Sequence, residues 1–246
     1  MAVTVHIKYG EEFSLLTSRF PMFSFLKYVS IPRNSSHCWN TNYEKWGYKD
    51  KTTYSFQVMF IGKTGYGKST TLNKIVGQDV FDTDDVSVCT KDLYEAKYRI
   101  DTSIPSFIDF CDLPGVGESN YADNDYYRWY KEMLEMSDVV IYVIRADQRD
   151  FAVDEHIFKN LFDTSEKKNK VILALNYADK VEPVNRSVGL SVEQIKSLER
   201  KIDDIAGIFN VLKKDIVYYS ATDKINIYLL MEKISQKLKK VHLTTE

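Results

Sequence analysis

The sequence from residue 62 to residue 69 reads Gly62-Lys63-Thr64-Gly65-Tyr66-Gly67-Lys68-Ser69. The apolar run from Phe56 to Gly62 predicts a strand before it, and the pattern from Ser69 to Val76 predicts a helix after it. Glycines let the backbone wrap closely, so that successive N–H groups and a helix N-terminus face phosphate oxygens. Because the glycine, lysine and hydroxyl positions arise together by chance in about 1% of chains this long, the segment predicts a phosphate-binding loop.

The whole chain has the composition of an ordinary globular protein. Its 246 residues are 44% hydrophobic and 28% charged, with a formal net charge of −2. This charge gives no long-range attraction to nucleic acid or anionic lipid. No run is long and apolar enough for a membrane span, and Met1 to Gly10 lacks the build of a signal peptide. Three irregularly spaced cysteines, Cys38, Cys89 and Cys111, indicate neither a disulfide framework nor a zinc site, so we expect a cytoplasmic protein.

Strand and helix patterns alternate from about residue 54 onward. This alternation predicts an α/β P-loop domain, residues 54–246, with a mostly parallel six-stranded sheet and helices on both faces. Two helices follow from apolar spacing, one from Ile195 to Phe209 with a capping box at Ser191 and Gln194, and one from Ile227 to Leu238. The six strands are Phe56 to Gly62, Leu93 to Ile100, Ser106 to Asp112, Val139 to Ile144, Val171 to Asn176 and Ile216 to Ser220.

Residues 1–53 form a predicted aromatic-rich extension outside this domain. Val3 to Tyr9 alternates between apolar and polar residues, and Phe20 to Ile31 indicates a short buried or interfacial segment. Trp39 and Trp46 are expected to pack on the core more often than to bind a ligand.

Two further motifs stand at predicted strand ends, where open α/β sheets bind ligands. In Asp112-Leu113-Pro114-Gly115, Asp112 is placed to hold Mg²⁺ through water and the Gly115 N–H to meet a γ-phosphate. Lys68 is expected at the β and γ phosphates and the Ser69 hydroxyl on Mg²⁺. An acidic residue would follow Asp112 in an ATP-dependent motor or kinase, and Leu113 disfavours that class.

The motif at the fifth strand end, Asn176-Tyr177-Ala178-Asp179, predicts guanine selectivity. An aspartate there accepts two hydrogen bonds from the guanine edge, which adenine cannot supply, and a buried carboxylate left unpaired rejects the wrong base. A backbone N–H of Ser220-Ala221 is expected at the guanine O6. The predicted nucleotide contacts are Gly62, Lys63, Thr64, Gly65, Tyr66, Gly67, Lys68, Ser69, Thr70, Asn176, Tyr177, Asp179, Ser220 and Ala221.

Taken together, these motifs resemble the TRAFAC-class GTPases of the Era/TrmE-like branch, over about residues 56–240. Four segments are similar to the bacterial YfjP/YkfA-type GTPases: Cys89 to Asp92, Asp112 to Ser119, Ile144 to Arg149 and Ala152 to Glu155. The resemblance implies that Thr90 is the switch I threonine that contacts Mg²⁺ and γ-phosphate. It therefore implies Ser69, Thr90 and Asp112 as the metal site, and Lys68, Thr90 and Gly115 as the catalytic group.

Three positions depart from familiar GTPase patterns. Val116 stands where Ras-like enzymes carry a water-orienting glutamine, which predicts slow intrinsic hydrolysis. Tyr177 replaces the usual lysine of the guanine motif, and its ring is expected to cover the base. Gly65 stands where potassium-activated relatives carry asparagine, so we expect no stimulation by potassium.

Several side chains keep two interpretations at this stage. Tyr126, Trp129, Tyr130 and Met133 share a helix face that either packs in the core or binds a partner. Arg145 and Arg149 are either solvated loop residues or arginine fingers across a dimer. His156 is expected to be an ordinary surface helix residue.

The sequence thus predicts a GTP- and GDP-binding protein with Mg²⁺ that hydrolyses GTP slowly. Segments around Asp79 to Thr90 and Val116 to Asn124 would order with the γ-phosphate and relax after its loss. The alternative is an assembly protein in which GTP controls a homodimer through the nucleotide face. The partner is an unidentified protein or ribosomal effector, and no nucleic-acid-binding module is recognisable.

Overall fold

A central β-sheet organises the chain in the computed structural model. The structure describes residues 5–31, 37–83, 92–100, 102, 104–116, 122–185 and 189–243. The sheet contains eight strands in the order β1-β4-β5-β3-β6-β7-β8, with β2 paired to β3. The strand bounds are β1 Val5–Glu12, β2 Cys38–Tyr43, β3 Tyr48–Ile61, β4 Leu93–Ile100, β5 Ser106–Asp112, β6 Val139–Arg145, β7 Val171–Asn176 and β8 Ile216–Tyr218.

All six predicted strands are present, but the prediction of a six-stranded sheet is wrong in number. The sheet gains β1, which runs parallel to β4, and β2, which runs antiparallel to the first half of β3. The residues of β2, Cys38–Tyr43, are mostly polar and only partly buried. Their sequence therefore shows little of the apolar alternation that predicts a strand. The β4–β5 pair is also antiparallel, and all remaining strand pairs of the sheet are parallel.

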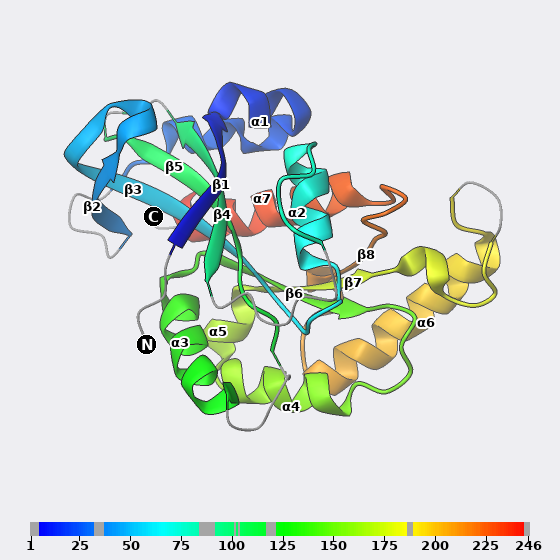
Figure 1. Ribbon diagram of the computed structural model, residues 1–246. Helices are drawn as coiled ribbons and strands as arrows, with labels where there is room; N and C mark the ends of the chain where they lie inside the picture. The colour runs from blue at the N-terminus through cyan, green and yellow to red at the C-terminus, as the bar shows by residue number, and fades with distance from the viewer. Residues whose placement is uncertain are drawn as a thin grey trace.

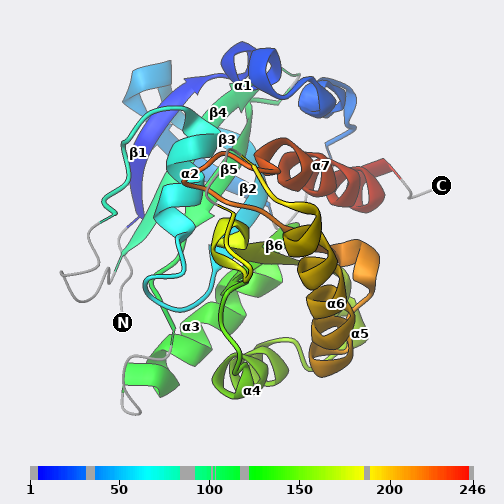
Figure 2. The ribbon, with the colours of Figure 1, turned by 90° about the vertical axis from the view of Figure 1, so that its right-hand side faces the viewer.

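Helices cover both faces of the sheet, as predicted (Figures 1 and 2). Phe56 of β3 contacts His242 of α7 on one face, whereas Tyr142 of β6 contacts Phe158 of α4 and Phe209 of α6 on the other. Because central strands are buried on both faces, β7 is apolar along almost its whole length. The α-helices are α1 Phe13–Arg19, α2 Lys68–Val76, α3 Ala122–Met136, α4 Ala152–Leu161, α5 Ser165–Asn169, α6 Val192–Phe209 and α7 Ile227–Leu243. The 3₁₀ turns are η1 Pro21–Tyr28, η2 Glu44–Trp46, η3 Ala178–Lys180 and η4 Lys213–Asp215.

The predicted capping box of α6 is confirmed. Ser191 Oγ accepts a hydrogen bond from the Gln194 backbone at 3.1 Å, and Gln194 Oε1 accepts one from the Ser191 backbone at 3.0 Å. These two bonds satisfy N–H groups that the first helical turn leaves without partners. The helix ends at Asn210, whose left-handed φ of 51° suits asparagine.

The N-terminal segment packs onto the sheet and its helices. Leu16, Phe23 and Leu26 are fully buried, which confirms the buried interpretation of Phe20 to Ile31. Arg19 donates hydrogen bonds to the carbonyl groups of Val76 and Lys74 at the end of α2. A helix C-terminus leaves such carbonyls without partners, so Arg19 ties this segment to the helix that follows the phosphate loop.

The two tryptophans of this segment differ. Trp46 packs against Tyr43 and Phe107, whereas Trp39 remains 37% exposed. A domain division after residue 53 stays a prediction, and β3 runs continuously across that position. Among the helices that the structure describes, none is long and apolar enough to cross a membrane.

Replacing Leu16 tests how firmly the N-terminal segment is held. Leu16→Ala should lower the free energy of unfolding by about 2–5 kcal/mol, since it removes a fully buried side chain. The matched change Leu15→Ala, at a residue that is 39% exposed, should stay within about 0.5 kcal/mol. Urea denaturation measures both, and equal small losses would contradict the packing of α1.

Candidate nucleotide site

The predicted phosphate loop connects β3 to α2. The backbone φ angles of Gly62, Gly65 and Gly67 are 150°, 77° and 85°, values that residues other than glycine rarely adopt. A Cβ atom at Gly62 would lie 2.3 Å from the Val143 carbonyl oxygen. The loop therefore needs its glycines both for conformation and for close contact with β6.

Lys68 and Ser69 open α2 and point into this loop. Lys68 Nζ donates to the carbonyl oxygens of Gly62 at 3.1 Å and Lys63 at 3.2 Å. Ser69 Oγ donates to Asp112 Oδ2 at 2.6 Å. The phosphate and metal residues predicted at Lys68, Ser69 and Asp112 thus come together, and Thr70 follows half-buried in the same turn.

Asp112 is a buried carboxylate with spare capacity. Its Oδ1 has no hydrogen-bond partner among the residues that the structure describes. Burial raises the pKa of this carboxyl, and Lys68 and the Ser69 hydroxyl act in the opposite direction. A carboxylate and a hydroxyl oxygen suit Mg²⁺, which takes few protein ligands and completes its shell with water and phosphate oxygens.

The segment after β5 lies directly on the phosphate loop. The Val116 N–H donates to the Gly62 carbonyl at 3.3 Å, and Val116 pairs with Lys63 as an isolated bridge. Gly115 touches Thr64 so closely that an added Cβ would lie 2.0 Å from Thr64 Oγ1. Thr90 lies outside the described residues, as do 84–91 and 117–121 of the predicted switch segments, so its assigned role stays a prediction.

Asn176 connects the phosphate loop to the base motifs. Its Nδ2 donates to the Tyr66 carbonyl at 3.0 Å, and its Oδ1 accepts from the Ala221 N–H at 3.1 Å. Ser220 N–H donates to the Ile225 carbonyl at 3.1 Å. Both N–H groups predicted for the guanine O6 therefore have acceptors within the protein, and the O6 contact stays a prediction.

Asp179 is buried at the same end of the sheet. It is 8% exposed, and its Oδ2 lies 2.8 Å from Lys180 Nζ. Its Oδ1 has no hydrogen-bond partner within the described part of the chain. A buried acceptor without a partner is costly unless a ligand supplies the donor.

Tyr177 reaches back to the phosphate loop. Its hydroxyl donates to the Gly65 carbonyl at 3.2 Å, and the Arg145 guanidinium lies 4.3 Å from its ring centre. Arg145 also binds Asp147 through two hydrogen bonds, at 3.0 and 2.7 Å. These contacts hold Arg145 against its own chain, which disfavours the arginine-finger interpretation for this residue, while Arg149 is exposed.

Comparisons with known proteins agree with this geometry. Residues 57–177 match the family model described as "50S ribosome-binding GTPase". The chain has the α/β fold of P-loop GTPases. Two uncharacterized proteins of Escherichia coli strain K12, YfjP and YkfA, are each 34% identical over 151 residues, which is 61% of this chain and 51% of theirs. The chain thus spans about half the length of these curated relatives.

Solved structures support the same fold. One, described as showing that dimerization is important for the GTPase activity of the chloroplast translocon components atToc33 and psToc159, has a TM-score of 0.60 and 20% identity. The match covers 100% of this chain and 98% of the chain in that structure. Toc33 from Arabidopsis thaliana in complex with Mg²⁺ and GMPPNP has a TM-score of 0.55 and 22% identity, covering 76% of this chain and 86% of its own.

The described part of the chain also contains a polar cluster that the sequence did not single out as a site. Tyr66 OH donates to Gln148 Oε1 at 2.8 Å and to Asp154 Oδ2 at 3.2 Å, and Lys63 Nζ lies 3.5 Å from the same oxygen. Asp154 is fully buried. Lys63 and Tyr66 are predicted nucleotide contacts, and because their side chains turn toward Asp154, the predicted contacts of these two residues would come from their backbone groups.

The aromatic face of α3 is partly buried and partly accessible to solvent. Tyr130 is buried and donates a hydrogen bond to the Pro114 carbonyl, whereas Trp129 and Met133 are half-buried. The Tyr126 side chain lies outside the described part of the structure. His156 is exposed on α4, as expected.

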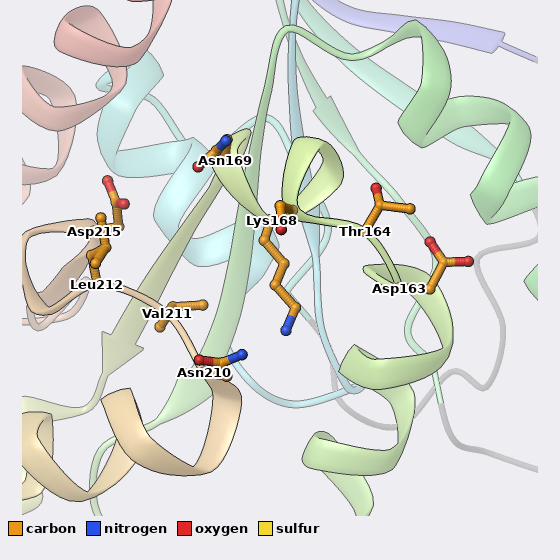
Figure 3. A pocket seen from close by; sticks show the side chains of 9 residues that line it. Asp163, Thr164, Lys168, Asn169, Asn210, Val211, Leu212 and Asp215 are labelled. Carbon is orange, nitrogen blue, oxygen red and sulfur yellow. The ribbon is translucent and has the colours of Figure 1, made fainter.

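A polar hollow of about 440 Å³ lies at the opposite edge of the sheet (Figure 3). On its wall, Asn169 lies two residues before β7 and Asp215 lies directly before β8, so the hollow lies at the N-terminal strand ends. None of its lining residues is buried. It lacks the enclosed polar groups of the nucleotide site.

Two glycines allow a matched test of the loop geometry. Gly67 and Gly189 have nearly equal φ values, 85° and 86°, but only at Gly67 would a Cβ meet another atom, Asn176 Nδ2 at 2.3 Å. Both alanine variants should lose about 1–2 kcal/mol for the left-handed backbone. Gly67→Ala should lose about 1–3 kcal/mol more, since Asn176 must move. Thermal and urea unfolding measure this difference, and equal losses would contradict the Asn176 contact.

Proposed function

We propose that this chain binds guanine nucleotide with Mg²⁺ and hydrolyses GTP slowly as a nucleotide-controlled switch. The observation that carries the proposal is the buried Asp179 Oδ1, which has no partner within the described residues and stands beside a loop suited to phosphates. Asn176 links the two places through hydrogen bonds to the Tyr66 carbonyl and the Ala221 N–H. A guanine edge supplies the donors that Asp179 lacks, and an adenine edge does not.

The phosphate end acts by position and charge. Lys68 would exchange its bonds to the Gly62 and Lys63 carbonyls for the β and γ phosphate oxygens. Ser69 and Asp112 would hold Mg²⁺, with Thr90 as a third ligand that the resemblance implies. The metal neutralises charge that develops on the phosphates during hydrolysis. The backbone N–H groups of the loop and of Gly115 would orient the γ-phosphate.

The environment of Val116 supports slow hydrolysis. Its side chain is 5% exposed and apolar, so it offers no group that orients a water molecule for attack. Effective turnover would then depend on a group from a partner or from the switch segments. The description of the matching family supports a ribosomal effector as one such partner.

Tyr177 is proposed to form one wall of the base site. Its ring is held from both ends, by the hydroxyl contact to Gly65 and by the Arg145 guanidinium. An aromatic ring held in this way covers a base face without losing much conformational entropy on binding.

Removing the Lys68 ammonium group tests the proposal. Lys68→Ala should weaken binding of a fluorescent GTP analogue by about 100-fold, because charge-assisted contacts to phosphate are lost. Lys74→Ala serves as the control, because Lys74 lies on the same helix and its Nζ lies 4.0 Å from Asp79 Oδ1. This variant should leave the affinity unchanged. An adenine analogue should bind much more weakly to the unaltered protein. Unchanged affinity in Lys68→Ala, or equal affinity for the two bases, would refute the assignment.

A second candidate is nucleotide-controlled assembly through the nucleotide face. The similar structure that covers the whole chain is described in terms of dimerization and GTPase activity, which supports considering the same coupling here. Hydrolysis would then be secondary or triggered by the partner subunit.

Sedimentation separates the two candidates. The chain with GMPPNP should sediment as a dimer if assembly is the function, and the chain with GDP as a monomer. A monomer in both states would exclude nucleotide-controlled dimerization and leave the switch proposal intact.

A further inference from the structure

A second cavity lies between the sheet and α3, away from the nucleotide motifs. It has a volume of about 310 Å³ and is bounded by residues of β1 to β5 and by Met133 and Met136 of α3. Figure 1 shows α3 on the opposite side of the sheet from α2, the helix that follows the phosphate loop. The cavity shares no lining residue with the phosphate loop or the base motif.

The floor of this cavity carries three buried charged side chains. Lys97 Nζ lies 2.5 Å from Asp109 Oδ2 and 3.3 Å from Glu95 Oε2, and all three residues are at most 5% exposed. Two carboxylates against one ammonium leave one negative charge in excess. A buried excess charge is costly, so this floor favours a positively charged ligand.

The floor also has acceptors with unused capacity. Asp109 Oδ2 already accepts from Lys97 and from Gln57 Nε2 at 3.2 Å. Its Oδ1 makes no hydrogen bond of normal geometry within the described residues, although the Ser55 side chain lies close enough to lower the pKa of this carboxyl. Among the residues that the structure describes, the donor to Glu95 Oε1 is the weak thiol of Cys111, at 3.8 Å. Burial raises the pKa of Asp109 to about 6, and the neighbouring Lys97 ammonium acts in the opposite direction.

The walls are apolar and aromatic. Trp39, Tyr43, Met59, Met133 and Met136 surround the floor, and Trp39 at the mouth is 37% exposed. Aromatic faces and thioethers accommodate both an apolar group and an adjacent cation. The volume lies at the lower end of the range for small-molecule pockets.

We propose that this cavity binds a small organic cation, an amidinium or protonated amine that carries an apolar group. The cation donates to Asp109 Oδ1 and Glu95 while its apolar part fills the space under α3. An anion is disfavoured because the two carboxylates outnumber the one ammonium group of Lys97. A neutral apolar molecule would leave the Asp109 acceptor unpaired. The site does not depend on the proposed nucleotide function.

Three probes of similar shape test the charge requirement. Calorimetric or NMR titration of the full chain, without nucleotide, should show saturable binding of benzamidinium. Neutral benzamide should bind at least about 10-fold more weakly, and benzoate should not bind. Amide shifts should map to Trp39 and to Met133 and Met136. Absence of saturable benzamidinium binding, equal binding of benzamide, or shifts confined to the nucleotide motifs would overturn the proposal.

Variants at the mouth avoid disturbing the buried ion pairs. Trp39→Ala should weaken benzamidinium binding by about 5-fold or more, since it removes an aromatic wall at a partly exposed position. Tyr228→Ala, at a residue that is 56% exposed on α7, serves as the matched control and should bind normally. The melting temperature of each variant shows whether it is folded. Unchanged affinity in folded Trp39→Ala would overturn the placement of the ligand.

Discussion

The two hydrogen bonds of the Asn176 side chain hold the candidate nucleotide site together. One joins the Tyr66 carbonyl of the phosphate loop and the other the Ala221 N–H beyond β8. The three segments come from distant parts of the chain, and Asn176 is 2% exposed where they meet. Substitution would leave buried backbone groups without partners on both sides, which costs more than the net value of either bond. Gly67 is part of the same constraint, because only glycine leaves room for the Asn176 amide.

Besides Asn176, the structure contains buried charged side chains in three separate places. Asp112 bonds to Ser69, Asp154 bonds to Tyr66 and Gln148, and Lys97 lies between Asp109 and Glu95. Each of these carboxylates except Glu95 retains an oxygen with no hydrogen bond in the described part of the chain. We propose that the spare oxygen meets a metal ion at Asp112 and an organic cation at Asp109. At Asp154 the donors include Tyr66 and Lys63 of the phosphate loop as well as Gln148, so this residue supports the loop from behind.

The N-terminal segment packs against the sheet and helices of residues 54–246. β1 extends the sheet beside β4, and Arg19 reaches the carbonyl groups at the end of α2. The same segment supplies Trp39 and Tyr43 to the cavity under α3. Substitutions in this segment are therefore expected to affect both the C-terminal end of α2 and the cavity under α3.

The sequence by itself determined the strand–loop–helix context of the phosphate loop, all six core strands and the capping box of α6. These features follow from short-range patterns, namely apolar periodicity, glycine placement and capping chemistry, which act within a few residues. The identity of Lys68, Ser69, Asp112 and Asn176 as neighbours was also predictable, because strand ends of a parallel sheet share one edge. Only the tertiary structure decided that Lys63 and Tyr66 point to Asp154 and that polar β2 pairs with β3. It also placed Lys97 over two carboxylates beneath α3. Each depends on which distant elements pack together, and local periodicity carries no information about that choice.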